Sequence, residues 1–80
     1  MKTDSFADLR GVSCPLNYVK TKLKLEDLLS GQTMEVLLDD GEPIINVPRS
    51  LKEDGHKILE VKRVEDHYSV IVQNIAKGGS

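Results

Sequence analysis

The side chain with the clearest capacity for chemistry is Cys14, the single cysteine among 80 residues. It lies in the stretch DLRGVSCPLNYVK, between the turn-forming Gly11 and Pro15. Pro15 suits the first position of a helix, because its missing N–H would have no intrahelical partner there in any case. This order predicts that Cys14 is the N-cap of a helix that runs to about Leu29, with its thiol beside unpaired main-chain N–H groups.

A thiol at a helix N-terminus is predicted to ionise readily. The unpaired N–H groups and the positive end of the helix dipole stabilise a thiolate and lower the pKa of a cysteine. Cysteine is not a usual N-cap residue, so its presence at Cys14 favours a chemical role over capping. Arg10, four residues earlier, would add positive potential. The alternative is that Cys14 is a small apolar residue of the core, a common fate of isolated cysteines.

Other reactions of cysteine lack their partners in this sequence. A cysteine hydrolase needs a base and an orienting group, and the two histidines, His56 and His67, are predicted to be solvated loop residues. A C-x-x-C oxidoreductase needs a second cysteine, and a zinc site needs about four regularly spaced ligands. The pairs Asp39–Asp40 and Glu53–Asp54 are typical of turns and caps. We therefore expect neither a metal nor another cofactor.

A single accessible thiolate without an internal base can still accept a group, hold it and pass it on. Sulfur is a suitable cargo, because a cysteine persulfide is one of the reversible states of a thiol. Enzymes that donate and accept the sulfur would then provide the remaining chemistry. The residues around Cys14 therefore predict that this side chain carries sulfur between proteins.

The periodicity of apolar residues predicts the elements that position Cys14. Alternation predicts strands over residues 5–10, 34–39, 57–65 and 67–75. In the third of these, Leu59 and Val61 would share one face. A stripe at helical spacing predicts a second helix, which Gly55 ends; its members are Ile44, Val47, Pro48 and Leu51. The order βαβαββ, closed by an antiparallel hairpin, predicts an α+β fold with two helices on one face of a four-stranded mixed sheet.

The first helix carries two apolar stripes. The stripe predicted to face the core consists of Tyr18, Leu25, Leu28 and Leu29. The second stripe lies more than a quarter-turn away and consists of Leu16, Val19 and Leu23. Either this second stripe is also buried against the neighbouring helix, or it stays exposed beside Cys14 as a docking patch for a partner.

Composition excludes several other classes of function. Charged residues of both signs make up 30% of the chain and leave a net charge of −2, without the basic excess of a nucleic-acid-binding protein. A single cysteine favours a reducing compartment, and no stretch approaches the roughly 20 apolar residues of a membrane span. We expect one domain over residues 1–77 with a flexible tail at 78–80, acting as a cytoplasmic monomer.

The stretch DLRGVSCP resembles the D-x-R-G-x-x-C-P signature of the TusA/SirA/YeeD-like sulfur-carrier family. The likeness extends over residues 6–75, through the helix after the cysteine, the DDGEP turn, the proline inside the second helix and the closing hairpin. It implies a two-layer α/β sandwich and a persulfide on Cys14. Many members have a second proline where this chain has Asn17. The signature positions that carry over are Asp8, Arg10, Gly11, Cys14 and Pro15.

The resemblance also implies protein partners. The donor would be of the cysteine desulfurase or rhodanese type, and the acceptor would serve tRNA thiolation, sulfur oxidation, molybdenum-cofactor enzymes or thiosulfate use. In that role the chain is one component of a relay and not a stand-alone enzyme. Two alternatives stay open: an interaction module in which Cys14 is incidental, and a sulfurtransferase that uses thiosulfate directly, with Arg10 and either Arg49 or Lys20 binding the anion.

Overall fold

The elements follow one another in the predicted order βαβαββ. A computed structural model describes residues 3–13 and 16–75. Its elements are β1 (Ser5–Asp8), α1 (Leu16–Glu26), β2 (Thr33–Asp39), α2 (Glu42–Glu53), β3 (Lys57–Val64) and β4 (His67–Gln73). The predicted domain boundary at residue 77 and the predicted tail at 78–80 lie outside the described residues. None of the helices in the described ranges is long and apolar enough to cross a bilayer.

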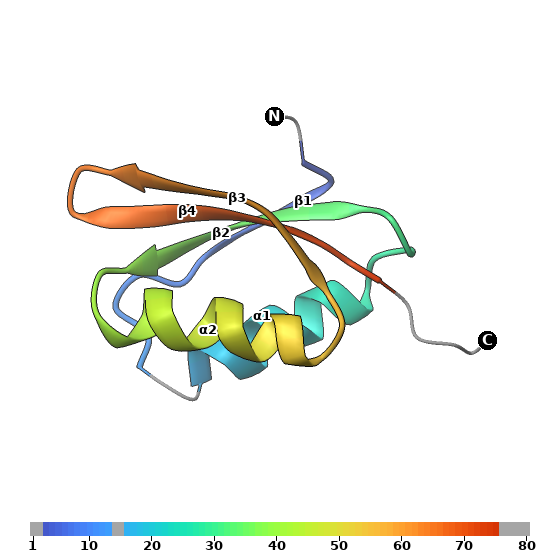
Figure 1. Ribbon diagram of the computed structural model, residues 1–80, viewed down its shortest axis with the longest axis horizontal. Helices are drawn as coiled ribbons and strands as arrows, with labels where there is room; N and C mark the ends of the chain where they lie inside the picture. Colours follow the sequence, from blue (N-terminus) through green and yellow to red (C-terminus); the bar gives the residue numbers. More distant parts are fainter. Residues whose placement is uncertain (1–2, 14–15, 76–80) are drawn as a thin grey trace.

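The four strands form one mixed sheet in the order β1-β2-β4-β3. β1 and β2 are parallel, and α1 makes the crossover between them, whereas β4 pairs antiparallel with both β2 and β3. Both helices lie on the same face of the sheet (Figure 1). The predicted α+β fold, with two helices covering one face of a four-stranded mixed sheet, is therefore confirmed.

The core lies between the sheet and the helices, and the central strands supply much of it. Met34, Val36 and Leu38 of β2 are buried, as their alternation predicts, because successive side chains of a strand point to opposite faces. Val70 and Val72 of β4 lie beside them, in register with Val36 and Met34. The predicted inward face of the sheet is therefore correct for both central strands.

α2 packs on this sheet through the predicted stripe. Val47, Pro48 and Leu51 are buried, and Ile44 is half-buried against the same core. Gly55, with a φ of 96°, follows the helix as predicted. Its N–H donates to the carbonyl of Lys52, and the next N–H donates to the carbonyl of Leu51. These two bonds form a Schellman motif, which fixes the direction in which β3 leaves the helix.

α1 is shorter than predicted. It ends at Glu26, and two bonds of three-residue spacing, from Asp27 N–H to Lys24 and from Leu28 N–H to Leu25, close its last turn. Leu25 is fully buried, and Tyr18 and Leu28 are half-buried against the core, as predicted. Leu29 follows the end of the helix and is 73% exposed, so the prediction that it belongs to the core is wrong.

The hairpin of β3 and β4 also departs from the simple alternation. The register shifts between Ile58, which pairs with Val72, and Glu60, which pairs with Ile71, so Leu59 is an extra residue at a bulge. Ile58, and not Leu59, therefore shares a face with Val61, whose partner is Val70. The prediction that Leu59 and Val61 share a face is wrong, although the predicted antiparallel pairing is correct.

Candidate functional site

Two loops meet at one end of the sheet, where β1 and β2 finish, and one of these loops leads into Cys14. Because β1 and β2 are parallel neighbours, their carboxyl ends lie at the same end of the sheet. Residues 9–13 follow β1 there, and residues 40–41 follow β2. Cys14 and Pro15 lie outside the described residues, so their predicted places as N-cap and first helical residue stay predictions. The site is therefore described from the segments that flank them.

Asp8 and Arg10, two residues of the signature, form an ion pair at the end of β1. The Arg10 Nε donates to Asp8 Oδ1 at 2.9 Å, and its Nη2 donates to Oδ2 at 2.7 Å. The main-chain N–H of Arg10 also donates to Oδ1, at 3.1 Å. These bonds hold the pKa of Asp8 at about 2 and raise the pKa of Arg10. Both side chains are exposed, so the pair shapes the turn more than it stabilises the fold.

The carboxyl of Asp8 is expected to titrate near pH 2 in the folded protein. Its folded pKa lies below the unfolded value of about 3.9, so the pair stabilises the fold above about pH 4 and this contribution is lost as the pH falls toward 2. Carboxyl ¹³C chemical shifts would measure the midpoint. Arg10→Gln should return it toward the ordinary aspartate value, whereas Arg49→Gln on α2 should not move it. A wild-type midpoint near 4 would contradict the ion pair.

Gly11 and Asp39 join the two loops. Gly11 adopts a φ of 80°, which a glycine reaches without strain, and its N–H donates to Asp39 Oδ2 at 2.6 Å. Asp39 is the last residue of β2. The sequence assigned Asp39–Asp40 only to turns and caps and missed this contact. The parallel pairing of β1 and β2 could have predicted this contact, because it brings the carboxyl ends of the two strands together.

Removal of the Asp39 carboxylate is expected to free the Gly11 amide. A hydrogen bond to a charged group contributes about 1.5–3 kcal/mol, so Asp39→Ala should speed hydrogen exchange at Gly11 by roughly tenfold or more. Asp39→Asn keeps an acceptor oxygen and should have a smaller effect. Asp40→Ala serves as the control, since the Asp40 carboxylate accepts from Gly41 instead. Equal exchange at Gly11 in the wild type and in Asp39→Ala would refute the contact.

Asn17 ties α1 to the loop from the other side. Its side chain is fully buried, its Nδ2 donates to the Val12 carbonyl at 3.4 Å, and its main-chain N–H donates to the Ser13 carbonyl at 3.1 Å. Thr21 is also fully buried and donates to the Asn17 carbonyl. Asn17 stands where many members of the sulfur-carrier family that the signature resembles have a proline, and a proline could not donate to Ser13. Asn17 in place of a proline thus adds two hydrogen bonds to the segment that precedes Cys14.

The second stripe of α1 is exposed. Leu16, Val19 and Leu23 are 50%, 42% and 58% exposed, so of the two readings that the sequence left open, burial against the neighbouring helix does not hold. Buried residues, Asn17, Thr21 and Leu25, occupy the opposite side of the helix. The stripe is named the α1 patch below. It begins two residues after Cys14 in the chain and is an apolar surface of the kind that contacts partners.

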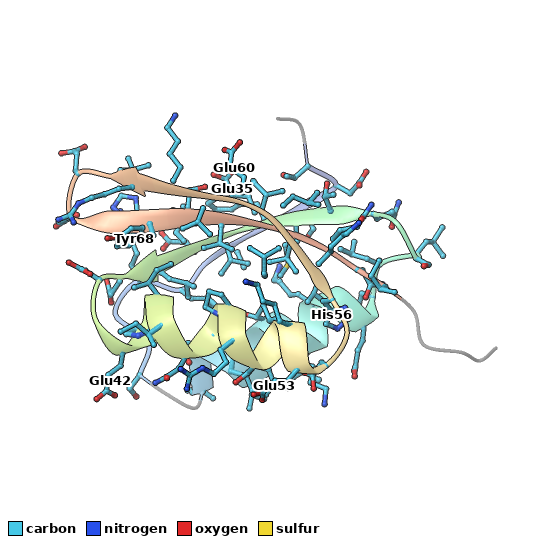
Figure 2. The ribbon with its side chains drawn as sticks, in the orientation of Figure 1. Glu35, Glu42, Glu53, His56, Glu60 and Tyr68 are labelled. Carbon is cyan, nitrogen blue, oxygen red and sulfur yellow. The ribbon has the colours of Figure 1, made fainter. Side chains whose placement is uncertain are left out.

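Neither histidine is the solvated loop residue that the sequence predicted. His67 begins β4, pairs with Asp39 and Val64, and is only 9% exposed, with its Nδ1 3.3 Å from Asp66. His56 is half-buried and its Nδ1 accepts the N–H of Ile75 at 3.2 Å. Figure 2 shows His56 beyond the C-terminal end of α2, whereas the loops of the site lie at the end where Glu42 begins that helix. His56 therefore cannot serve as a base beside the Gly11 loop.

A pocket of about 330 Å³ lies where the two loops meet. It is lined by residues 11–13, by Pro43 and by three acidic residues, Asp39, Asp40 and Glu42. Within residues 3–13 and 16–75, no group of three metal-binding side chains is placed to hold an ion. The carboxylates give this side of the site a negative charge, which opposes the binding of a small anion.

Comparisons with known proteins show which family the chain belongs to. Residues 6–74 match the family profile described as Sulfurtransferase TusA. The chain belongs to the TusA family. A relative in Archaeoglobus fulgidus, named "Putative sulfur carrier protein", is 35% identical over 74 residues, which cover 91% of this chain and 84% of the relative. The predicted resemblance is confirmed.

Two further proteins show how far the likeness extends. The protein of Buchnera aphidicola named Sulfur carrier protein TusA is 29% identical over 70 residues, covering 88% of this chain and 89% of that protein. A crystal structure of a SirA-like protein from Desulfitobacterium hafniense superposes with a TM-score of 0.76. It is 19% identical to this chain, and the match covers 90% of this chain and 99% of that structure, so it shows the likeness of fold alone.

Proposed function

We propose that this protein is a sulfur carrier, which accepts persulfide sulfur on Cys14 and passes it to an acceptor protein. Membership of the TusA family and the names of its relatives support the role of carrier. The observation that carries the proposal for Cys14 is the hydrogen-bonded turn that precedes it in the chain. Asp8, Arg10 and Gly11 form a turn that hydrogen bonds hold in place, and Cys14 follows three residues after Gly11.

The transfer can be written without any group from outside the two proteins. The Cys14 thiolate attacks the outer sulfur of a persulfide on the donor, a new S–S bond forms at Cys14, and the donor S–S bond breaks. The donor cysteine leaves as a thiolate, and the proton of the persulfide stays with the transferred sulfur or passes to water. The acceptor repeats the same exchange with the Cys14 persulfide. No net oxidation occurs in either step.

The charges of the site favour a donor in which the sulfur is bound to protein. Arg10, which would bind thiosulfate if the chain used that anion directly, is already bound to Asp8 by two side-chain bonds. The pocket beside residues 11–13 is lined by carboxylates, which repel a dianion. Arg49 lies on α2 and Lys20 on α1, so they belong to separate elements. We therefore infer a cysteine desulfurase or rhodanese-type donor in preference to free thiosulfate.

The α1 patch is proposed as the surface on which donor and acceptor dock. Leu16, Val19 and Leu23 are exposed on the side of α1 that faces away from the core, and they follow Cys14 closely in the chain. A docked partner would bury these side chains and bring its own cysteine to the Gly11 loop. We propose that the carrier acts as a cytoplasmic monomer, as one component of a relay, with Pro15 starting the helix after the thiol.

A reconstituted relay tests this role. The reduced protein is mixed with a cysteine desulfurase and ³⁵S-cysteine, repurified, and then offered to a purified acceptor. The label should load to roughly one sulfur per chain and move on when the acceptor is added, whereas the isolated chain should show no steady turnover of thiosulfate with a thiol acceptor. Turnover of thiosulfate by the chain alone would support the stand-alone sulfurtransferase instead.

The exposed α1 patch also favours a second candidate, an interaction module in which Cys14 is incidental. Such a module needs the patch and not the thiol. The two candidates therefore differ in what they predict for Cys14→Ser, which leaves Leu16, Val19 and Leu23 unchanged.

A further inference from the structure

A groove runs between β1 and α1. It has a volume of about 390 Å³ and is lined by residues 6–9 together with Lys20, Leu23 and Lys24. Phe6 is 50% exposed and Leu23 is 58% exposed, so two large apolar side chains lie open at the groove. Leu23 also belongs to the α1 patch, which makes the groove continuous with that surface. The family match assigns no role to this groove.

One wall of the groove is the free edge of the sheet. β1 is a terminal strand in the order β1-β2-β4-β3. Leu9 donates its N–H to the carbonyl of Leu37 in β2, and the main-chain groups of successive residues in a strand point to opposite edges. The N–H and C=O groups of Phe6 and Asp8 therefore point away from β2. The Nζ of Lys24 lies 3.5 Å from the Phe6 carbonyl, which agrees with this direction.

The opposite wall is basic. Lys20 and Lys24 are exposed on α1 at the groove, in a chain whose net charge is −2. The one carboxylate in the lining, that of Asp8, is paired with Arg10. The groove thus combines apolar side chains, outward-pointing main-chain groups and two lysines that form no ion pair with any residue in the described ranges. An extended segment can add to a free sheet edge through main-chain bonds, and acidic side chains complement a basic wall.

We propose that this groove binds an extended acidic segment of a partner protein. The segment would pair with the edge of β1, place apolar side chains against Phe6 and Leu23, and place carboxylates beside Lys20 and Lys24. Lys24 would exchange its contact with the Phe6 carbonyl for one with the segment. The inference rests on the proposed function only in that the partner is one that exchanges sulfur with Cys14, since the binding itself needs no thiol.

Selection from a displayed library of random 12-residue peptides tests the groove without knowledge of the partner. The reduced full-length protein is the target, and the selected peptides are then synthesised and titrated. We expect acidic and apolar sequences, with affinity reduced at least tenfold by Lys20→Glu/Lys24→Glu. The control Lys52→Glu/Lys62→Glu makes the same change of charge on α2 and β3 and should alter the affinity less than twofold. The amides of Phe6 and Asp8 should gain protection from hydrogen exchange when the peptide binds.

Three results would overturn the proposal. They are recovery of no binders or only basic or neutral binders, equal loss of affinity in both double variants, and protection on β3 instead of β1. Dimers that form through β1 in the absence of peptide would mean that a second copy of the chain occupies the groove. Loading of Cys14 from a small-molecule persulfide is measured on the same proteins. It should be unaffected by Lys20→Glu/Lys24→Glu, and its failure in the wild type would count against the carrier role and not against the groove.

Discussion

Cys14→Ser is expected to abolish sulfur transfer while leaving the fold and the binding of partners unchanged. Serine has nearly the same size as cysteine, but its hydroxyl forms no persulfide. The contacts that hold the neighbouring loop, from Gly11 to Asp39 and from Asn17 to Val12, do not involve this side chain. We expect no detectable ³⁵S on the variant, a loss of at least about a hundredfold given the usual dependence on the nucleophile.

Ser13→Ala is the matched control for Cys14→Ser. It removes the neighbouring hydroxyl, and the carbonyl of Ser13 that accepts from Asn17 remains. Transfer by this variant should stay within about twofold of the wild type, since surface substitutions without buried partners have small effects. If Cys14→Ser still carried label to the acceptor, the thiol would be incidental and the interaction module would be the better account.

Leu25→Ala should have the largest effect on stability among changes in α1. Leu25 is fully buried between the helix and the sheet, and truncation of a buried leucine costs about 2–5 kcal/mol. Small domains have a free energy of unfolding of about 5–15 kcal/mol, so this loss is a large fraction of the total. Chemical denaturation followed by circular dichroism would measure the change.

Leu29→Ala provides the comparison, because the sequence placed both leucines on the same buried stripe. Leu29 is 73% exposed after the end of α1, so its truncation should change the free energy of unfolding by less than about 0.5 kcal/mol. Equal losses in the two variants would show that α1 continues to Leu29 and buries both. That result would require a different packing of α1 on the sheet.

The parts of the fold that sequence predicts well are those in which one face is buried throughout. Met34, Val36 and Leu38 alternate, so residue type alone gives the inward face of β2. The apolar stripe of α2 and the glycine that follows the helix can be predicted from residue type in the same way. Gly55 has the positive φ that ends the helix, and few other residues adopt that conformation without strain.

The inner face of α1 could not be read in the same way, because two of its buried residues are polar. Asn17 and Thr21 satisfy their hydrogen bonds within the loop and the helix, through the carbonyls of Val12 and Asn17, so their burial carries little penalty. A periodicity of apolar types misses them. Asn17, Thr21 and Leu25 follow one another at intervals of four residues, and this spacing is the signal that would have placed all three on one face.

The other features that the sequence did not predict depend on how the strands pair with one another. The bulge at Leu59 arises from the register of β3 against β4, which neither strand encodes alone. His67 appeared to belong to a loop but is buried at the start of β4, where it pairs with Asp39. The contact of Asp39 with Gly11 likewise joins residues 28 apart in sequence. Such contacts can be predicted only when the order of the strands in the sheet is known.

Mass spectrometry of the reduced protein after incubation with a persulfidated donor tests the central claim most directly. The carrier role predicts a gain of about 32 Da, one sulfur atom per chain, removed by reductant and located on the peptide that contains Cys14. A protein whose Cys14 reacts with an alkylating reagent, yet gains no such mass from several donors, would contradict the carrier role.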